Sequence, residues 1–108
     1  MSPDQIKPLY VRHSSEEDRY VIAVPNPFKF HLRKSFRQAY LSIPEDQKVE
    51  FDFSQVTSLD SAAIGMLLVA FEHFGHNRDH VVLSNLHQQV RVILEMANLD
   101  RVFTILPS

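Results

Sequence analysis

The sequence contains no cysteine, no tryptophan and only two glycines. Without cysteine the chain can form neither disulfides nor thiolate metal sites, and a reducing compartment is allowed. No stretch approaches the roughly 20 apolar residues of a membrane-spanning helix. The first residues, MSPDQIKPLYVRH, also lack the apolar run of a signal peptide. These absences predict a cytoplasmic protein that does not insert into a membrane.

An excess of basic charge is absent as well. The formal net charge is −2, which gives no electrostatic case for direct nucleic-acid binding. Hydrophobic residues make up 44% and charged residues 22% of the chain, values typical of a globular protein. A length of 108 residues fits a single domain over 1–108, in which residues 1–8, with two prolines, are expected to form a loose leader.

The segment 49–74 organises the expected fold. It opens with Val49, Phe51 and Phe53 alternating with acidic residues, and this period of two predicts a β-strand. After a short polar connection, residues 62–74 carry apolar side chains at helical spacing. Strand, loop and helix are therefore expected in that order.

Further elements flank this segment. Apolar runs at 9–13 and 20–24 predict two strands joined by a polar loop, and the segment 25–27, with two prolines, excludes regular structure. Helices are predicted over 32–43 and 87–97, and strands over 81–83 and 102–106. The order β-β-α-β-α-β-α-β predicts an α/β domain with a mixed sheet of about five strands covered by about three helices.

The junction before the central helix reads Ser58-Leu59-Asp60-Ser61. Asp and Ser are favoured N-caps because their side-chain oxygens accept free amide N–H groups, so Asp60 or Ser61 is expected to cap the helix. The residues that follow would let a partner approach closely because they are small: Ala62, Ala63 and Gly65. A function should be sought first at this helix start.

The sequence VTSLDSAAIG at 56–65 resembles the signature of STAS domains, the fold of bacterial anti-sigma factor antagonists. That signature places an apolar residue, Asp, Ser, two small residues, an aliphatic residue and Gly at a strand-to-helix junction. Residues 81–85 and 90–99 look like the family's following strand and last helix. The N-terminal part matches less well, since the loop 25–30 carries Lys29 where many members have an acidic residue.

The resemblance implies a switch. In the antagonist branch, the serine after the signature Asp is phosphorylated by an anti-sigma factor with serine kinase activity, and a PP2C-type phosphatase removes the phosphate. The unmodified antagonist binds the anti-sigma factor. Carried over by motif, Ser61 is the phosphorylation site, while Ser58 lies off the motif. The implied partner-binding residues are Ser58, Asp60, Ser61, Ala62, Ala63, Gly65 and Met66.

Several alternatives stay open from the sequence. Asp60 and Ser61 can be a plain helix cap, with or without phosphorylation. The chain can also be a STAS subunit of a transport or envelope complex, such as an ABC-type lipid transporter, that docks on an ATPase without a phosphate switch. A third possibility is a small-molecule or nucleotide sensor. The helix 62–74 is apolar nearly all round, which predicts either full burial or exposure of Met66, Val69 or Ala70 to a partner.

Catalysis and metal binding are not supported. The chain has no Gly-rich phosphate loop and no nucleophile elbow, so we predict neither an enzyme nor a cofactor. His73, His76 and His80 lie close in sequence but lack an H-E-x-x-H arrangement, which favours a solvated polar rim over a metal site. We interpret the basic residues Arg33, Lys34 and Arg37 as a solvated helix face.

Overall fold

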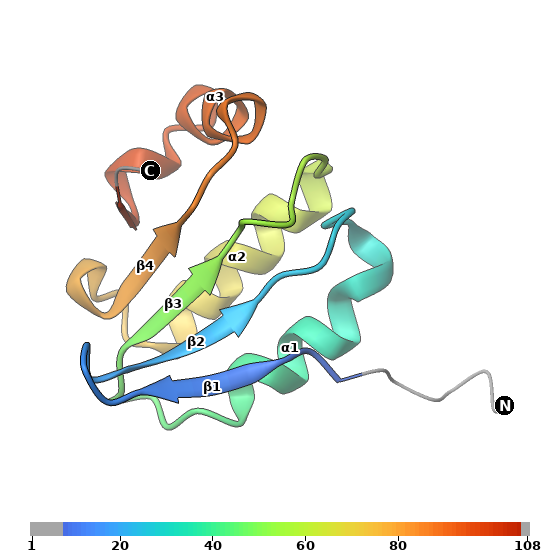
Figure 1. Ribbon diagram of the computed structural model, residues 1–108. Coiled ribbons are helices and arrows are strands. Elements are labelled where there is room, and N and C mark those ends of the chain that lie inside the picture. Colours follow the sequence, from blue (N-terminus) through green and yellow to red (C-terminus); the bar gives the residue numbers. More distant parts are fainter. Residues whose placement is uncertain (1–7, 107–108) are drawn as a thin grey trace, which may run out of the picture.

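A five-stranded β-sheet forms the centre of the structure, a computed structural model that describes residues 8–106 (Figure 1). The strands are β1 (Val11–Ser14), β2 (Arg19–Ala23), β3 (Val49–Asp52), β4 (Val81–Ser84) and β5 (Thr104–Ile105). Their order in the sheet follows the chain. The β1–β2 pair is antiparallel and every later pair is parallel. The predicted α/β class with a mixed sheet is confirmed.

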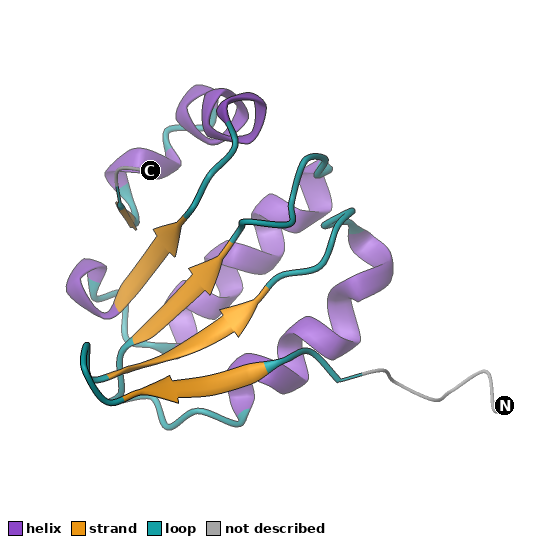
Figure 2. Ribbon diagram, viewed as in Figure 1, coloured by secondary structure: helices purple, strands orange, loops and turns teal. Residues whose placement is uncertain are grey.

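Three α-helices connect the parallel strands, and Figure 2 shows α1 and α2 behind the sheet in that view. Their bounds are α1 (Arg33–Leu41), α2 (Ser61–His73) and α3 (Gln88–Met96). Short 3-10 helices, which the sequence did not predict, precede α1 and β4 and follow α3: η1 (Phe30–Leu32), η2 (Arg78–His80) and η3 (Leu99–Arg101). Within residues 8–106, no helix is both long and apolar enough to cross a membrane.

Two predicted boundaries need correction. The last strand was expected over 102–106 but covers only Thr104–Ile105, because Val102 continues from η3 in a right-handed helical conformation. The first strand begins at Val11, two residues later than expected. The predicted leader at 1–8 lies outside the described residues except for Pro8, which has no regular structure.

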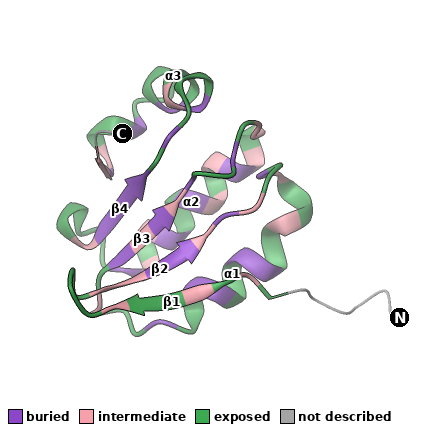
Figure 3. Cartoon of the chain, viewed as in Figure 1, coloured by how far each residue is buried: buried purple, intermediate pink, exposed green. Residues whose placement is uncertain are grey.

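The core lies between the sheet and α1 and α2. Ile22, Phe51 and Leu83 are paired across three neighbouring strands, and all three are fully buried. Figure 3 shows that β3 and β4 are largely buried. Phe36 of α1 stacks on Phe51 with a centroid distance of 5.2 Å. Such aromatic pairs add to the free energy of burial, so α1 is held firmly on the sheet.

The opposite face of the sheet carries a polar network. Glu50 of β3 accepts hydrogen bonds from Arg19 Nε at 2.9 Å and from Ser84 Oγ at 2.7 Å. The buried Ser84 hydroxyl is therefore satisfied, and three adjacent strands are tied together by side chains. Glu50, one of the two alternating acidic residues of β3, is accordingly only partly exposed.

Helix α2 has one buried face and one exposed face, whereas the sequence left open whether it is fully buried or partly exposed. Ala63, Leu67 and Ala70 face the core and are fully buried, whereas Val69 is 52% exposed. The expectation that Ala70 faces a partner is therefore wrong, since the spacing of 63, 67 and 70 places all three on the sheet side. Met66 is partly exposed. An apolar helix thus keeps part of its surface in contact with solvent.

Gly75 ends α2 in a Schellman motif. Its φ is +79°, and its N–H donates to the Glu72 carbonyl at 3.0 Å. The next N–H, that of His76, reaches back to the Phe71 carbonyl at 3.1 Å, and the two rings pack edge-on. Only glycine adopts this left-handed conformation without a steric cost.

We predict that Gly75→Ala lowers the free energy of unfolding by about 1 kcal/mol, because alanine in the left-handed region is strained. Gly65→Ala is the matched control. Gly65 lies inside α2, and a Cβ added there meets no atom within 4 Å, so alanine should raise stability by about 0.5–1 kcal/mol. Urea denaturation of both variants measures whether each substitution lowers or raises the free energy of unfolding. Equal effects would contradict the assigned cap.

Candidate functional site

Asp60 is the N-cap of α2. Its backbone is extended, with φ −113°, and its Oδ1 accepts a hydrogen bond from the Ala63 N–H at 2.9 Å. The sequence left the cap open between Asp60 and Ser61, and the structure assigns it to Asp60. Ser61 is the first residue of α2 and is exposed. The Ser61 hydroxyl is therefore not required to hold the start of the helix.

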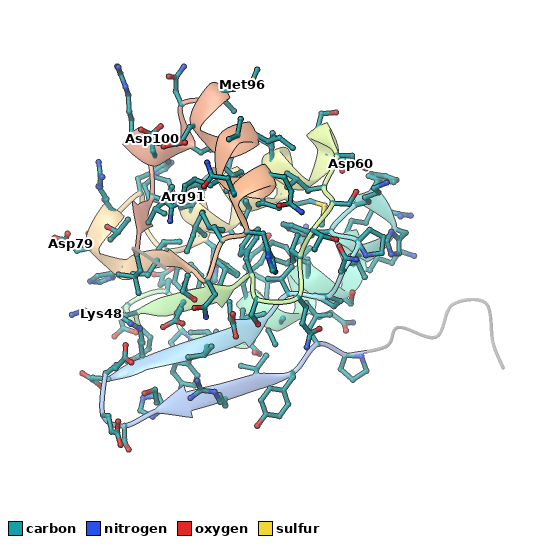
Figure 4. All side chains as sticks on the ribbon, turned by 45° about the horizontal axis from the view of Figure 1, so that its top comes forward. Lys48, Asp60, Asp79, Arg91, Met96 and Asp100 are labelled. Carbon is teal, nitrogen blue, oxygen red and sulfur yellow. The ribbon has the colours of Figure 1, made fainter. Side chains whose placement is uncertain are left out.

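The second oxygen of Asp60 reaches another loop. Oδ2 accepts from the Phe30 N–H at 3.2 Å, so one carboxylate joins the start of α2 to the connection between β2 and α1. Partial removal from water opposes ionisation, but two amide hydrogen bonds and the charge of Lys29 outweigh it, so the pKa of Asp60 lies below its ordinary value. Figure 4 shows Asp60 at the edge of the molecule, away from Lys48, which precedes β3.

Asn26 holds the same two loops together. Its Oδ1 accepts from the Thr57 N–H at 2.9 Å, the Thr57 hydroxyl at 3.2 Å and the Ser58 N–H at 3.1 Å. The Phe28 N–H donates to the Ser58 carbonyl at 2.9 Å, and Phe28 and Leu59 form an isolated parallel bridge. The connections after β2 and after β3 are therefore locked side by side.

The role of Asn26 was not predicted from the sequence. The segment from Pro25 to Pro27 was expected only to interrupt regular structure. The signal for this role was an asparagine between two prolines, which lack a backbone N–H donor. In such a loop, the asparagine side chain can supply hydrogen bonds that the backbone cannot. The lysine that departs from the expected acidic residue, Lys29, lies beside Asp60, where its charge favours the ionised carboxylate.

The structure brings the predicted site residues together around the start of α2. Ser61 and Gly65 are exposed, and the residues that are only partly exposed are Ser58, Asp60, Ala62 and Met66. Ala63 is fully buried, so its side chain serves packing and its N–H serves the cap. Ala62, Gly65 and Met66 also line a groove between α2 and α1. The candidate site is thus a surface with several small residues, beyond the carboxyl ends of the inner strands β2 and β3.

The histidines do not gather into a ligand set. Within residues 8–106, no group of three or more His, Asp or Glu side chains is placed to hold a metal ion. The predicted solvated rim needs correction at His73, which is partly buried with Nε2 3.0 Å from the Ile43 carbonyl oxygen. Its ring also packs against Tyr40 and Phe74. His73 therefore fastens the end of α2 to the end of α1.

We predict that Asp60→Asn destabilises the protein at pH 7 and that the difference from the native chain shrinks below about pH 4. Because the folded pKa of Asp60 is lowered, its ionised form contributes stability above the ordinary carboxyl pKa, and this contribution is lost as pH falls through the folded pKa. Urea midpoints at several pH values measure the effect. Asp46→Asn, in the exposed loop before β3, is the control. A pH-independent difference would contradict the role of the carboxylate charge.

Comparison with known sequences identifies relatives along most of the chain. The family model for the STAS domain matches residues 10–108. A STAS-domain containing protein of Pseudomonas aeruginosa is 31% identical over 93 residues, which cover 85% of this chain and 92% of that protein.

Solved structures show the same fold at low sequence identity. An anti-sigma-factor antagonist (STAS) domain protein from Planctomyces limnophilus superposes with a TM-score of 0.76 at 17% identity, covering 94% of this chain and 92% of that one. The unphosphorylated form of the anti-sigma factor antagonist SpoIIAA gives 0.67 at 12% identity, covering 93% and 88%. The phosphorylated form of SpoIIAA, from Bacillus, gives 0.59 at 13% identity, covering 93% and 92%. With the family match over residues 10–108, the matching fold and the signature at the start of α2, this chain belongs to the STAS domain family.

Proposed function

We propose that this protein is an anti-sigma factor antagonist that acts as a phosphorylation-switched binding module and not as an enzyme. It binds an anti-sigma factor with serine kinase activity while Ser61 is unmodified, phosphorylation of Ser61 releases it, and a PP2C-type phosphatase restores it. One observation carries this proposal. The Ser61 hydroxyl is exposed at the first position of α2, while Asp60 alone supplies the cap.

The start of α2 can accept a phosphate without unfolding. The first N–H groups of a helix and its dipole favour negative charge, by about 0.3–1 kcal/mol at an exposed site. Asp60 adds a nearby negative charge, which opposes the phosphate, but its two oxygens are already held by the Ala63 and Phe30 amides. Lys29 supplies a cation at the same place. The fold therefore tolerates the modification.

The same modification would disrupt a bound partner. On α2, Ser61 is followed by the small residues Ala62 and Gly65, which allow close contact with a partner. A phosphate adds about −1.5 to −2 charges there, and burying it against an apolar or acidic partner surface costs desolvation and repulsion. Binding is then lost while folding is kept. Two forms of SpoIIAA, phosphorylated and unphosphorylated, have been solved in this fold, which supports the proposal by analogy.

We predict that Ser61→Ala keeps the anti-sigma factor bound and that Ser61→Asp weakens binding at least tenfold, or by about 1.4 kcal/mol. A pull-down from the protein's own cells, followed by affinity measurement with the captured kinase, compares the two. Ser15→Asp is the matched control because Ser15 is also an exposed serine, but it lies in the turn between β1 and β2. Mass spectrometry of the native protein should find the phosphate on Ser61.

Two results would contradict the proposal. The first is a native protein whose Ser61 is never modified. The second is one stable partner that the alanine and aspartate variants retain equally. A partner ATPase held by both variants would instead identify a constitutive subunit of a transport complex.

A further inference from the structure

A groove of about 520 Å³ runs between α1 and α2, beside the proposed switch. Figure 1 shows these two helices side by side on one face of the sheet. Phe36 and Tyr40 of α1 and Met66 and Val69 of α2 line the groove, with Phe30 at one end. Phe30 is 55% and Val69 52% exposed, values high for large apolar side chains. The groove is therefore an apolar surface open to solvent.

One rim of this groove is basic. Arg33, Lys34 and Arg37 all line it, and all three are exposed. Among the residues that the structure describes, none of the three forms an ion pair with a carboxylate within 4.0 Å. The Arg33 guanidinium lies over the Phe30 ring, 4.3 Å from its centroid, which places a cation at the Phe30 end of the groove. The chain as a whole is slightly acidic, so this basic rim is a local feature.

We propose that the groove between α1 and α2 binds an acidic amphipathic helix of the partner protein, whose apolar side chains fill the groove while its carboxylates pair with Arg33, Lys34 and Arg37. Apolar grooves between helices bind helices that carry anchors at i, i+3, i+4 and i+7. Charge complementarity selects an acidic segment, because a basic one would place like charges together. This proposal rests on the proposed function, which identifies the partner as an anti-sigma factor. It adds the chemistry of the partner segment that docks in the groove.

The groove also has a polarity along its length. Beyond Arg37 and Val69 it continues into a hollow lined by Glu45, Glu72 and His73. The docking helix should therefore carry its carboxylates at the end near Arg33. Ser61 precedes Ala62, which lines this basic end. A phosphate on Ser61 would add negative charge where the partner's carboxylates bind, so one modification opposes both contacts.

Two synthetic helical peptides test this chemistry on the whole protein. Both carry leucines at i, i+3, i+4 and i+7, and the flanking residues are glutamate in one and lysine in the other. In a ¹H–¹⁵N titration we expect the glutamate peptide to bind at least tenfold more tightly and to shift the amides of Arg33, Gly65 and Val69. Added salt should weaken its binding.

Matched variants localise the contact. Arg37→Glu should abolish the preference for the glutamate peptide, whereas Arg101→Glu, the same change in η3, should leave it intact. Val69→Ser should weaken binding, and Val92→Ser, at an exposed valine of α3, should not. Unchanged spectra of the free variants establish that each still folds.

Several results would overturn the proposal. They are equal affinity for the two peptides, no binding of either, or shifts confined to α3. Dodecanoate, a single-chain fatty acid, is titrated in the same way as a control. If it binds the groove when neither peptide does, the groove is a site for small amphiphiles. A concentration-dependent dimer that Val69→Ser dissociates would make it a self-interface. None of these experiments modifies Ser61. The absence of a phosphorylation switch can therefore be distinguished from the absence of peptide binding in the groove.

Discussion

The Asp60 carboxylate is the interaction on which the functional edge of this protein depends. One oxygen caps α2 through Ala63, and the other holds the Phe30 amide in the connection that leads to α1. Asn26 reinforces the link by accepting from Thr57 and Ser58. The connections after β2 and after β3 are therefore held together as one surface. The amide hydrogen bonds from Ala63 and Phe30 and the charge of Lys29 outweigh desolvation and keep the pKa of Asp60 low.

This arrangement separates the stability of the fold from the chemistry of the proposed switch. Because Asp60 does the capping, Ser61 can change its charge without removing a hydrogen bond that the helix needs. The nearby Lys29 and the start of α2 would accommodate the proposed phosphate, whereas a docked partner would not. The basic rim of the groove between α1 and α2 begins at the same place, so the proposed modification and the proposed docking surface share one electrostatic environment.

Much of this could be predicted from the sequence because it depends on periodicity and local chemistry. The alternation at Val49 and Phe51 and the helical spacing after Asp60 predicted the correct strand and helix. Contacts between distant segments could not be predicted. The Asn26 bridge spans about thirty residues of sequence, and the burial of Ala70 depends on how α2 is rotated against the sheet. The pairing of α1 with α2 that forms the groove is equally non-local.

The most direct test of this account places phosphoserine at position 61 during synthesis and compares ¹H–¹⁵N spectra and thermal unfolding with those of the unmodified protein. We predict shifts confined to the start of α2, the loop that carries Asn26 and the basic end of the groove, with the midpoint of unfolding nearly unchanged. Shifts throughout the sheet, or a collapse of thermal stability, would contradict it, because the modification would then act on the fold and not on a surface.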